Sequence, residues 1–149
     1  MTELAVMSPV AGSVVGLADV PDPVFAEAMV GPGLAVVPSS GAVVAPVAGT
    51  VATLHPHAFV VATESGRAVL VHLGIDTVKL KGEGFTLLVA KGDVVTAGQP
   101  MIEWDPVAIS AAGYSPVCPV IALDASADVL ADVHEPGVVG AGDRLFSWR

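Results

Sequence analysis

Short stretches rich in valine follow one another along the chain, and glycine or proline separates them about every 8 to 12 residues. Turn residues at this spacing are typical of β-sandwiches and β-barrels. The pattern predicts an all-β fold, with strands at Val14–Leu17, Leu34–Pro38, Ala42–Ala45, Thr50–Leu54, Ala58–Thr63, Ala68–Leu73, Phe85–Val89, Met101–Trp104, Val117–Ala122 and Arg144–Trp148. Helical patterns are few, and they predict short helices at Pro23–Met29, Asp105–Ala112 and Ala125–Leu130.

Two sequence motifs occur twice. The segment Pro9–Val14 returns with one substitution as Pro46–Val51, and Val94–Ile102 resembles Val138–Phe146 in having a valine pair, a glycine turn and an apolar strand. Repetition on this scale indicates stacked β-units, so we expect a pseudo-symmetric sandwich, although a valine-rich chain also produces such likeness by chance. Nothing resembles a linker, and the sequence therefore predicts a single domain over residues 1–149.

The apolar composition raises the question of a membrane protein. Hydrophobic residues make up 53% of the chain, and the mean hydropathy is +0.73. Even so, glycine, proline or a charge interrupts every apolar stretch before it reaches the roughly 18 residues that a spanning helix needs. Glu3 stands where a signal peptide would be basic, and the first Lys or Arg is Arg67. We therefore expect no direct membrane insertion and no leader peptide.

The charge balance restricts the partners. Six Lys plus Arg against 15 Asp plus Glu give a formal net charge of −9. Nucleic acids and anionic lipids are bound by clustered basic residues, so this balance argues against both and favours a basic protein. The single cysteine, Cys118, rules out an internal disulfide and fits a reducing compartment, so we expect a cytoplasmic protein.

The histidines are the candidates for chemistry. His55 and His57 are two apart on one predicted strand, and His72 lies at the end of the next apolar strand. A two-residue loop at Glu64 and Ser65 would place His57 directly opposite His72, with Cβ atoms about 4.5 to 5.5 Å apart. A register shifted by one residue would instead place the two side chains on opposite faces.

Several chemistries can use two facing imidazoles. A zinc site needs three or four ligands, and the sequence has neither an HExxH motif nor a cysteine cluster, so we expect no metal and no cofactor. A hydrolase is disfavoured because no Gly-x-Ser-x-Gly motif occurs and Cys118 lies in an apolar segment typical of a core. A phosphoryl carrier fits better: one neutral histidine acts as the nucleophile, and a second hydrogen-bonds a phosphoryl oxygen. His134, before a Glu-Pro-Gly turn, is expected to be structural.

The sequence around His72 resembles a known family. Val71–Phe85 reads VHLGIDTVKLKGEGF, and it is similar to the signature of the glucose-type enzyme IIA component of the bacterial phosphoenolpyruvate-dependent sugar phosphotransferase system. Val44–Thr50 and His57-Ala58-Phe59 complete the pattern, in the same order along the chain. The resemblance extends from Ser8 to the C-terminus, and it implies a compact antiparallel β-sandwich.

The resemblance also implies roles and partners. His72 would be the phosphorylated residue, a phosphohistidine in a phosphotransferase component, and His57 would stabilise the phosphoryl group. The donor would be the histidine-containing phosphocarrier protein, and the acceptor would be a cysteine of a sugar-specific enzyme IIB domain. A shallow apolar docking face with an acidic rim, on a protein that we expect to be monomeric, would comprise Asp22, Val24, Phe25, Glu27, Met29, Val30, Leu70, Gly74, Asp76 and Val78.

Some of these positions have alternative interpretations. Phe25 and Leu70 can belong to the core, and Gly74 and Asp76 can be turn residues. Many family members have a threonine where this chain has His55, and His55 can either orient the site through a ring nitrogen or point away from it.

Other functions stay open at this stage. The unphosphorylated face can bind other transporters or enzymes in some members of the family, which would make the chain a regulatory protein. Lys79 and Lys81 suggest a biotinyl or lipoyl carrier, but the Met-Lys-Met and Asp-Lys-Ala motifs of such modules are missing. The sugar cannot be deduced, because an enzyme IIA component does not touch it.

Overall fold

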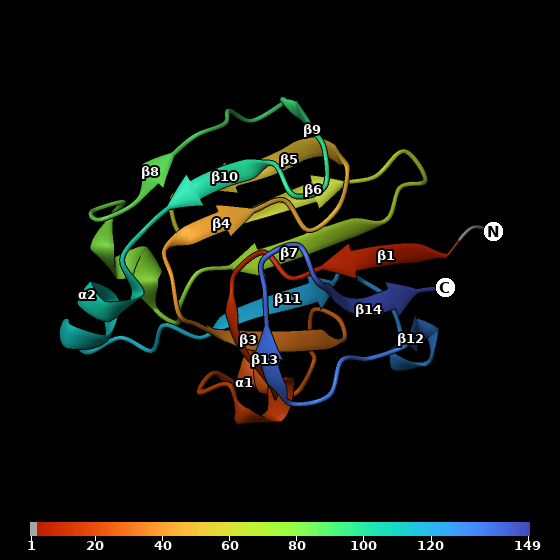
Figure 1. Cartoon of the computed structure of the whole chain (residues 1–149), viewed down its shortest axis with the longest axis horizontal. Coiled ribbons are helices and arrows are strands. Elements are labelled where there is room, and N and C mark those ends of the chain that lie inside the picture. The colour runs from red at the N-terminus through yellow and green to blue at the C-terminus, as the bar shows by residue number, and fades with distance from the viewer. Residues whose placement is uncertain (1–2) are drawn as a thin grey trace.

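The computed structural model describes residues 3–149 and confirms the antiparallel all-β fold (Figure 1). The strands are β1 Leu4–Met7, β2 Gly12–Gly16, β3 Gly33–Pro38, β4 Ala42–Val44, β5 Gly49–His55, β6 Ala58–Ala62, β7 Ala68–His72, β8 Thr86–Leu87, β9 Val94–Val95, β10 Pro100–Glu103, β11 Cys118–Ala122, β12 Leu130–Ala131, β13 Gly137–Val139 and β14 Arg144–Trp148. The helices α1 Pro23–Ala26 and α2 Pro106–Ala111 and the 3-10 turns η1 Leu17–Asp19, η2 Thr77–Leu80 and η3 Ala127–Val129 are short.

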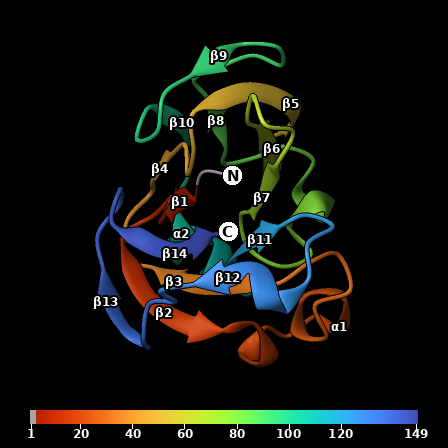
Figure 2. The same ribbon diagram turned by 90° about the vertical axis from the view of Figure 1, so that its right-hand side faces the viewer.

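The strands form three antiparallel sheets around one main core. The large sheet has the order β13-β2-β3-β11-β7-β6-β5-β9, and the two small sheets have the orders β1-β14-β12 and β4-β10-β8. Figure 2 shows the large sheet curling around the molecule from β9 to β13, with β4, β1 and β14 on the remaining side. The two ends of the chain lie side by side, because Leu4 pairs with Trp148. Phe59, Met101 and Phe146 are among the fully buried side chains of the core.

The repeated sequence motifs occupy equivalent places, which confirms the predicted pseudo-symmetry. Gly12 pairs with Val139 where β2 meets β13, and the matching Gly49 pairs with Val95 where β5 meets β9. The two units also exchange backbone hydrogen bonds: Met7 N–H donates to Pro46 at 2.9 Å, and Val44 N–H donates to Pro9 at 2.8 Å. The likeness between the motifs therefore reflects structure rather than chance.

A close backbone approach explains the glycine within the first motif. A Cβ atom on Gly12 would lie 2.0 Å from the carbonyl oxygen of Val37, and one on Gly49 would lie 2.2 Å from that of Ala62. No side chain fits at either distance. Both copies of the motif thus need glycine for the same steric reason.

Several predicted boundaries need correction. Leu17 lies in η1 rather than in a strand, and Pro23–Met29 is helical only as far as Ala26, with Ala28 in the left-handed region at φ 53°. The helix predicted at Ala125–Leu130 is wrong: a single 3-10 turn is followed by the short strand β12. The strands β1, β9, β12 and β13 were not predicted. Most of them have only two or three residues, which is too few for a periodic pattern to show.

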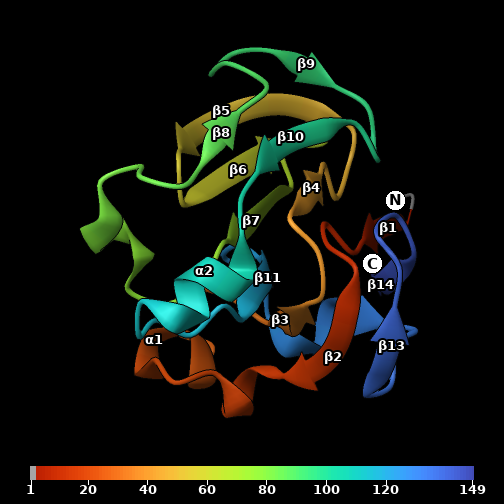
Figure 3. The same cartoon turned by 60° about the vertical axis from the view of Figure 1, so that its left-hand side comes forward.

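A second, smaller apolar cluster lies beside the main core. Its buried residues come from the η1–α1 segment, from β3 and β11, from the segment after β7 and from the residue before β11. They are Leu17, Val20, Phe25, Ala35, Ile75, Val117 and Ile121. Figure 3 shows α1, α2 and the segment after β7 at the same end of the molecule. No helix within residues 3–149 is long and apolar enough to cross a membrane.

Candidate functional site

His57 lies in a tight turn rather than on a strand. β5 and β6 form a hairpin in which His55 pairs with Ala58, so Pro56 and His57 are the two loop residues. The prediction that His55 and His57 share one strand is therefore wrong. Proline fixes its own φ and suits a turn better than a paired strand, which explains why the strand ends at His55.

The predicted register between β6 and β7 is also wrong, by one residue. His72 pairs with Ala58, not with His57. The loop has three residues instead of two, because Thr63 N–H donates to the carbonyl of Arg67 at 2.8 Å. Gly66 takes the left-handed conformation, at φ 86°, that the third position of such a loop requires.

The two imidazoles nevertheless lie side by side. The ring centroids of His57 and His72 are 5.3 Å apart, with an angle of 67° between the ring planes. A hydrogen bond of 2.7 Å from Leu73 N–H to the carbonyl of His57 continues the β6–β7 pairing into the turn. Successive side chains of a strand point to opposite faces of the sheet, but His57 is a turn residue and does not follow this alternation. Its side chain can therefore face His72 in spite of the shifted register.

The carbonyl of Gly74 selects one tautomer of His72. His72 Nδ1 lies 2.5 Å from this oxygen, which can only accept, so Nδ1 carries the hydrogen. In the neutral ring the lone pair is then on Nε2. Gly74 has φ 78°, and a Cβ atom there would lie 2.7 Å from Thr77 Cγ2 and 2.9 Å from the carbonyl oxygen of Ser115. Gly74 is thus both the turn residue and the hydrogen-bond acceptor of the site.

Further hydrogen bonds hold the loop after β7. Thr77 Oγ1 donates to the carbonyl of Leu73 at 2.7 Å, and Ile75 N–H donates to the carbonyl of Ser115 at 2.9 Å. Sequence reasoning missed Thr77 and Ser115 as parts of this support. The four-residue spacing from Leu73 to Thr77 gives a local signal for the first, whereas Ser115 comes from a distant segment and leaves none.

His55 lies beside the pair. Its ring stacks on that of His57, with centroids 5.6 Å apart and an angle of 24°. The side chain is exposed to solvent, whereas His57 and His72 are half-buried. The His55 ring therefore lies against that of His57, and its role in orienting the site through a ring nitrogen stays a prediction.

The environment favours the neutral form of both central histidines. Burial lowers the pKa of His57 below 6.5, and the neighbouring His72 and His55 lower it further. Burial also lowers the pKa of His72, although the Gly74 carbonyl and the carboxylates of Asp22 and Asp76 oppose this shift. At neutral pH both rings are therefore uncharged, as a nucleophilic imidazole must be.

The predicted docking residues differ in their exposure to solvent. Val24, Met29 and Val78 are 40%, 68% and 58% exposed. Phe25 is buried, with its ring centroid 5.3 Å from that of His72, and Leu70 and Val30 pack against the same small cluster. Phe25 therefore belongs to the core, and its ring lies beside that of His72 on the buried side of the site. The acids Glu27 and Asp76 are exposed and Asp22 is half-buried, and Asp22 also caps α1 by accepting from Val24 N–H at 2.9 Å.

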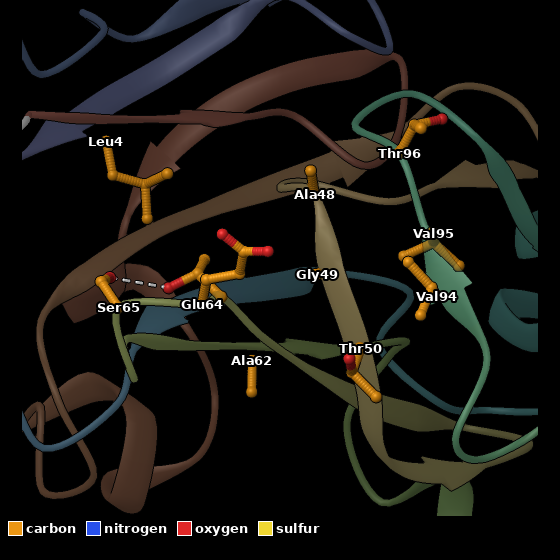
Figure 4. A pocket seen from close by; sticks show the side chains of 11 residues that line it. Leu4, Ala48, Gly49, Thr50, Ala62, Glu64, Ser65, Val94, Val95 and Thr96 are labelled. Carbon is orange, nitrogen blue, oxygen red and sulfur yellow. Dashed lines mark hydrogen bonds between the residues drawn. The ribbon is translucent and has the colours of Figure 1, made fainter.

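Other candidate features lie outside this cluster. His134 Nδ1 bonds the carbonyl of the adjacent Glu135 at 2.6 Å. Within residues 3–149, no three histidine, cysteine or acidic side chains are grouped to hold a metal ion. A groove of about 650 Å³ lies between β5, β9 and the loop after β6, and its lining includes Thr50, Glu64 and Val94 but no histidine (Figure 4).

Comparison with known proteins gives the family. Residues 4–127 match the family model described as the phosphoenolpyruvate-dependent sugar phosphotransferase system, EIIA 1. This chain belongs to that EIIA family. An EIIA relative, the glucose-specific EIIA component of Oceanobacillus iheyensis, is 41% identical over 80% of this chain and 73% of its own. The glucose-specific EIIA component of Staphylococcus aureus is 36% identical over 95% of this chain and 86% of its own.

A solved EIIA structure and a longer relative agree with this assignment. The structure of glucose permease IIA from Mycoplasma capricolum superposes with a TM-score of 0.92 at 33% identity, over 100% of this chain and 97% of that one. The β-glucoside-specific EIIBCA component of Bacillus subtilis is 38% identical over 94% of this chain, but the match spans only 23% of that longer protein. The predicted family and β-sandwich are thus confirmed, and the chain is a component of the sugar phosphotransferase system.

Proposed function

We propose that this EIIA protein carries a phosphoryl group on Nε2 of His72. The observation that carries the proposal is the hydrogen bond between His72 Nδ1 and the Gly74 carbonyl, because it leaves the nucleophilic lone pair on Nε2. The lowered pKa of His72 keeps that lone pair free of a proton at neutral pH. His57 is the partner, with its ring 5.3 Å away and able to donate a hydrogen bond to a phosphoryl oxygen.

The transfer is an in-line displacement at phosphorus. Nε2 of His72 forms a bond to phosphorus while the nitrogen–phosphorus bond of the donor histidine breaks, and the donor imidazole keeps the electron pair of that bond. In the second transfer a thiolate of the acceptor attacks the same phosphorus, and the imidazole of His72 leaves. The Gly74 carbonyl supports the phosphorylated ring, because it continues to accept from Nδ1–H throughout.

The docking face suits a basic protein donor. The net charge is −9, and the acids Glu27 and Asp76 are exposed, as are the apolar side chains of Met29 and Val78. Acidic groups around an apolar centre attract a basic partner and favour rapid association. Donor and acceptor would use this face in turn, which a monomer in the cytoplasm allows.

His55 is proposed as an orienting residue for His57. Its ring stacks on that of His57, with centroids 5.6 Å apart, and limits how the turn side chain can rotate. The positive charge of a protonated His55 also disfavours protonation of the neighbouring His57.

The relatives support the proposed partners. Two are named as glucose-specific EIIA components, and a third contains an EIIB part in the same polypeptide as its EIIA part. We therefore propose the histidine-containing phosphocarrier protein as the donor and a cysteine of an enzyme IIB domain as the acceptor. Glucose is the first sugar to test. The same exposed apolar face could bind regulatory targets when His72 is unphosphorylated.

Phosphorylation in vitro tests the proposal. The purified protein and its His72→Ala variant are incubated with phosphoenolpyruvate, enzyme I and the histidine-containing carrier, and intact masses are measured at neutral or alkaline pH. We expect one acid-labile phosphate on the wild-type protein and none on the variant. No adduct on the wild type, with a known EIIA protein labelled in the same tube, would contradict the carrier function and leave regulatory binding.

A further inference from the structure

The turn that carries His57 lies against the loop that follows His72. His57 comes directly after Pro56 in the turn between β5 and β6, and Pro56 is half-buried. A Cβ atom on Gly82 would lie 3.2 Å from Pro56 Cγ and 3.6 Å from Pro56 Cβ. Gly82 comes shortly after η2 and has φ 86°. The loop that begins at His72 therefore reaches the residue next to His57.

Hydrogen bonds hold this loop along its length. Thr77 Oγ1 is buried and donates to the carbonyl of Leu73 at 2.7 Å, which holds the first turn of the loop. Lys81 N–H donates to the carbonyl of Val78 at 3.2 Å, which holds the last turn before Gly82. Because both turns are closed in this way, the position of Gly82 is fixed relative to the start of the loop.

The turn is supported on three sides. The pairing of β5 with β6 closes it at its base. Leu73 N–H, which donates to the carbonyl of His57 at 2.7 Å, holds it beside the end of β7. The third support is the contact between Gly82 and the ring of Pro56. Because that ring fixes the φ of Pro56, a displacement of the ring passes to the backbone of His57.

We propose that Pro56 is a positioning residue for phosphoryl transfer, because the close contact of Gly82 with its ring keeps the His57 imidazole beside His72. Glycine suits position 82 because the backbone is left-handed there and because a Cβ atom would press on the proline ring. Pro56 does not touch the phosphoryl group. The kinetic consequence rests on the proposed function, whereas the effect on the spacing of the two rings, 5.3 Å between centroids, does not.

Two glycines close together in the sequence provide matched variants. Gly82 has φ 86° and Gly84 has φ 88°, so an alanine strains the backbone to a similar extent at either position. Among the residues that the structure describes, no atom lies within 4 Å of the place of a Cβ atom on Gly84. Gly82→Ala should therefore press on Pro56, whereas Gly84→Ala should carry the backbone strain alone.

Two measurements follow the position of His57 in these variants. Cross-relaxation between the ring protons of His57 and His72 reports the spacing of the imidazoles in the unphosphorylated protein. Single-turnover transfer from the isolated phosphoprotein to an enzyme IIB domain reports donation. We expect Gly82→Ala to weaken the cross-relaxation and to slow donation about threefold to tenfold, because a misplacement of about 1 Å can cost about 100-fold and this one is smaller. Acceptance of phosphate should change less, and Gly84→Ala should match the wild type in both measurements.

A double variant tests whether the effect passes through Pro56. Pro56→Ala removes Cγ and keeps Cβ, which lies at an ordinary contact distance of 3.6 Å from the place of a Cβ atom on Gly82. Gly82→Ala should therefore slow donation much less in the Pro56→Ala background than alone. Equal slowing in both backgrounds, the same slowing in Gly84→Ala, or unchanged cross-relaxation in folded Gly82→Ala would overturn the proposal. If the wild type accepts no phosphate, the proposed function fails, and the cross-relaxation still decides the role of Pro56.

Discussion

The backbone N–H of Leu73 donates to the carbonyl of His57 at 2.7 Å. This bond lies one step beyond the last strand pair, Ala58 with His72, and it holds the histidine turn beside the end of β7. The two catalytic candidates are thus brought together by backbone pairing, and their rings meet edge to face.

Gly74→Ala should impair both stability and phosphorylation. The left-handed backbone costs an alanine about 1–2 kcal/mol, and here the new Cβ would also lie 2.7 Å from Thr77 Cγ2. Gly66→Ala is the matched control, because Gly66 has φ 86° but no atom lies within 4 Å of the place that its new methyl group would take. Chemical denaturation should show the larger loss for Gly74→Ala. Equal losses, with normal phosphorylation of both, would contradict the steric argument.

His57→Ala should separate acceptance from donation. His72 keeps its bond to Gly74 in this variant, so it should still take phosphate from the carrier. Without the imidazole that stabilises the phosphoryl group, transfer to an enzyme IIB domain should slow by about 10²-fold. Single-turnover transfer from the isolated phosphoprotein measures this step. Complete loss of acceptance would refute the division of roles between the two histidines.

Two substitutions at Asp22 should separate its charge from its capping role. Asparagine caps a helix about as well as aspartate, whereas alanine loses the cap at a cost of about 0.5–2 kcal/mol. Because the Asp22 carboxylate raises the pKa of His72, both variants should lower that pKa further. NMR titration of His72 should therefore show the same direction for Asp22→Asn and Asp22→Ala, with only the second losing stability. A rise in the pKa would contradict this electrostatic account.

Stability should depend on the protonation of the central histidines. The pKa values of His57 and His72 lie below the unfolded value of 6.5, so the unfolded chain binds protons first as the pH falls. The contribution of the neutral rings is fully present above pH 6.5 and is lost as the pH falls through the folded pKa values. The free energy of unfolding is measured by chemical denaturation from pH 5 to 8, at about one-unit intervals, for the wild type and for the double variant His57→Gln/His72→Gln. A stability difference that does not change with pH would contradict the lowered pKa values.

Much of the fold could be predicted from the sequence because its strands alternate with clear turn residues. β14 was predicted with its observed bounds, and the repeated motifs correctly indicated two equivalent units. Two-residue strands such as β9 and β12 left no periodic signal, since their pairing depends on distant segments.

The site was predicted only in part. His57 and His72 were correctly expected to meet, but by a register that the structure contradicts, because Gly66 adds a third residue to the loop. The hydrogen bond from Ile75 N–H to the Ser115 carbonyl, which supports the loop after His72, could not be predicted, since Ser115 comes from a distant segment of the chain. Local spacing therefore indicated the histidines but not their support.

The most direct test of the account is to identify the phosphorylated nitrogen. Protein labelled with nitrogen-15 is phosphorylated by the histidine-containing carrier, and the His72 ring is observed at mildly alkaline pH. Because Nδ1 donates to the Gly74 carbonyl, the account expects the phosphate on Nε2 of His72 and hydrogen on Nδ1. Phosphate on Nδ1, on another residue, or on none while a known EIIA protein is labelled would contradict it.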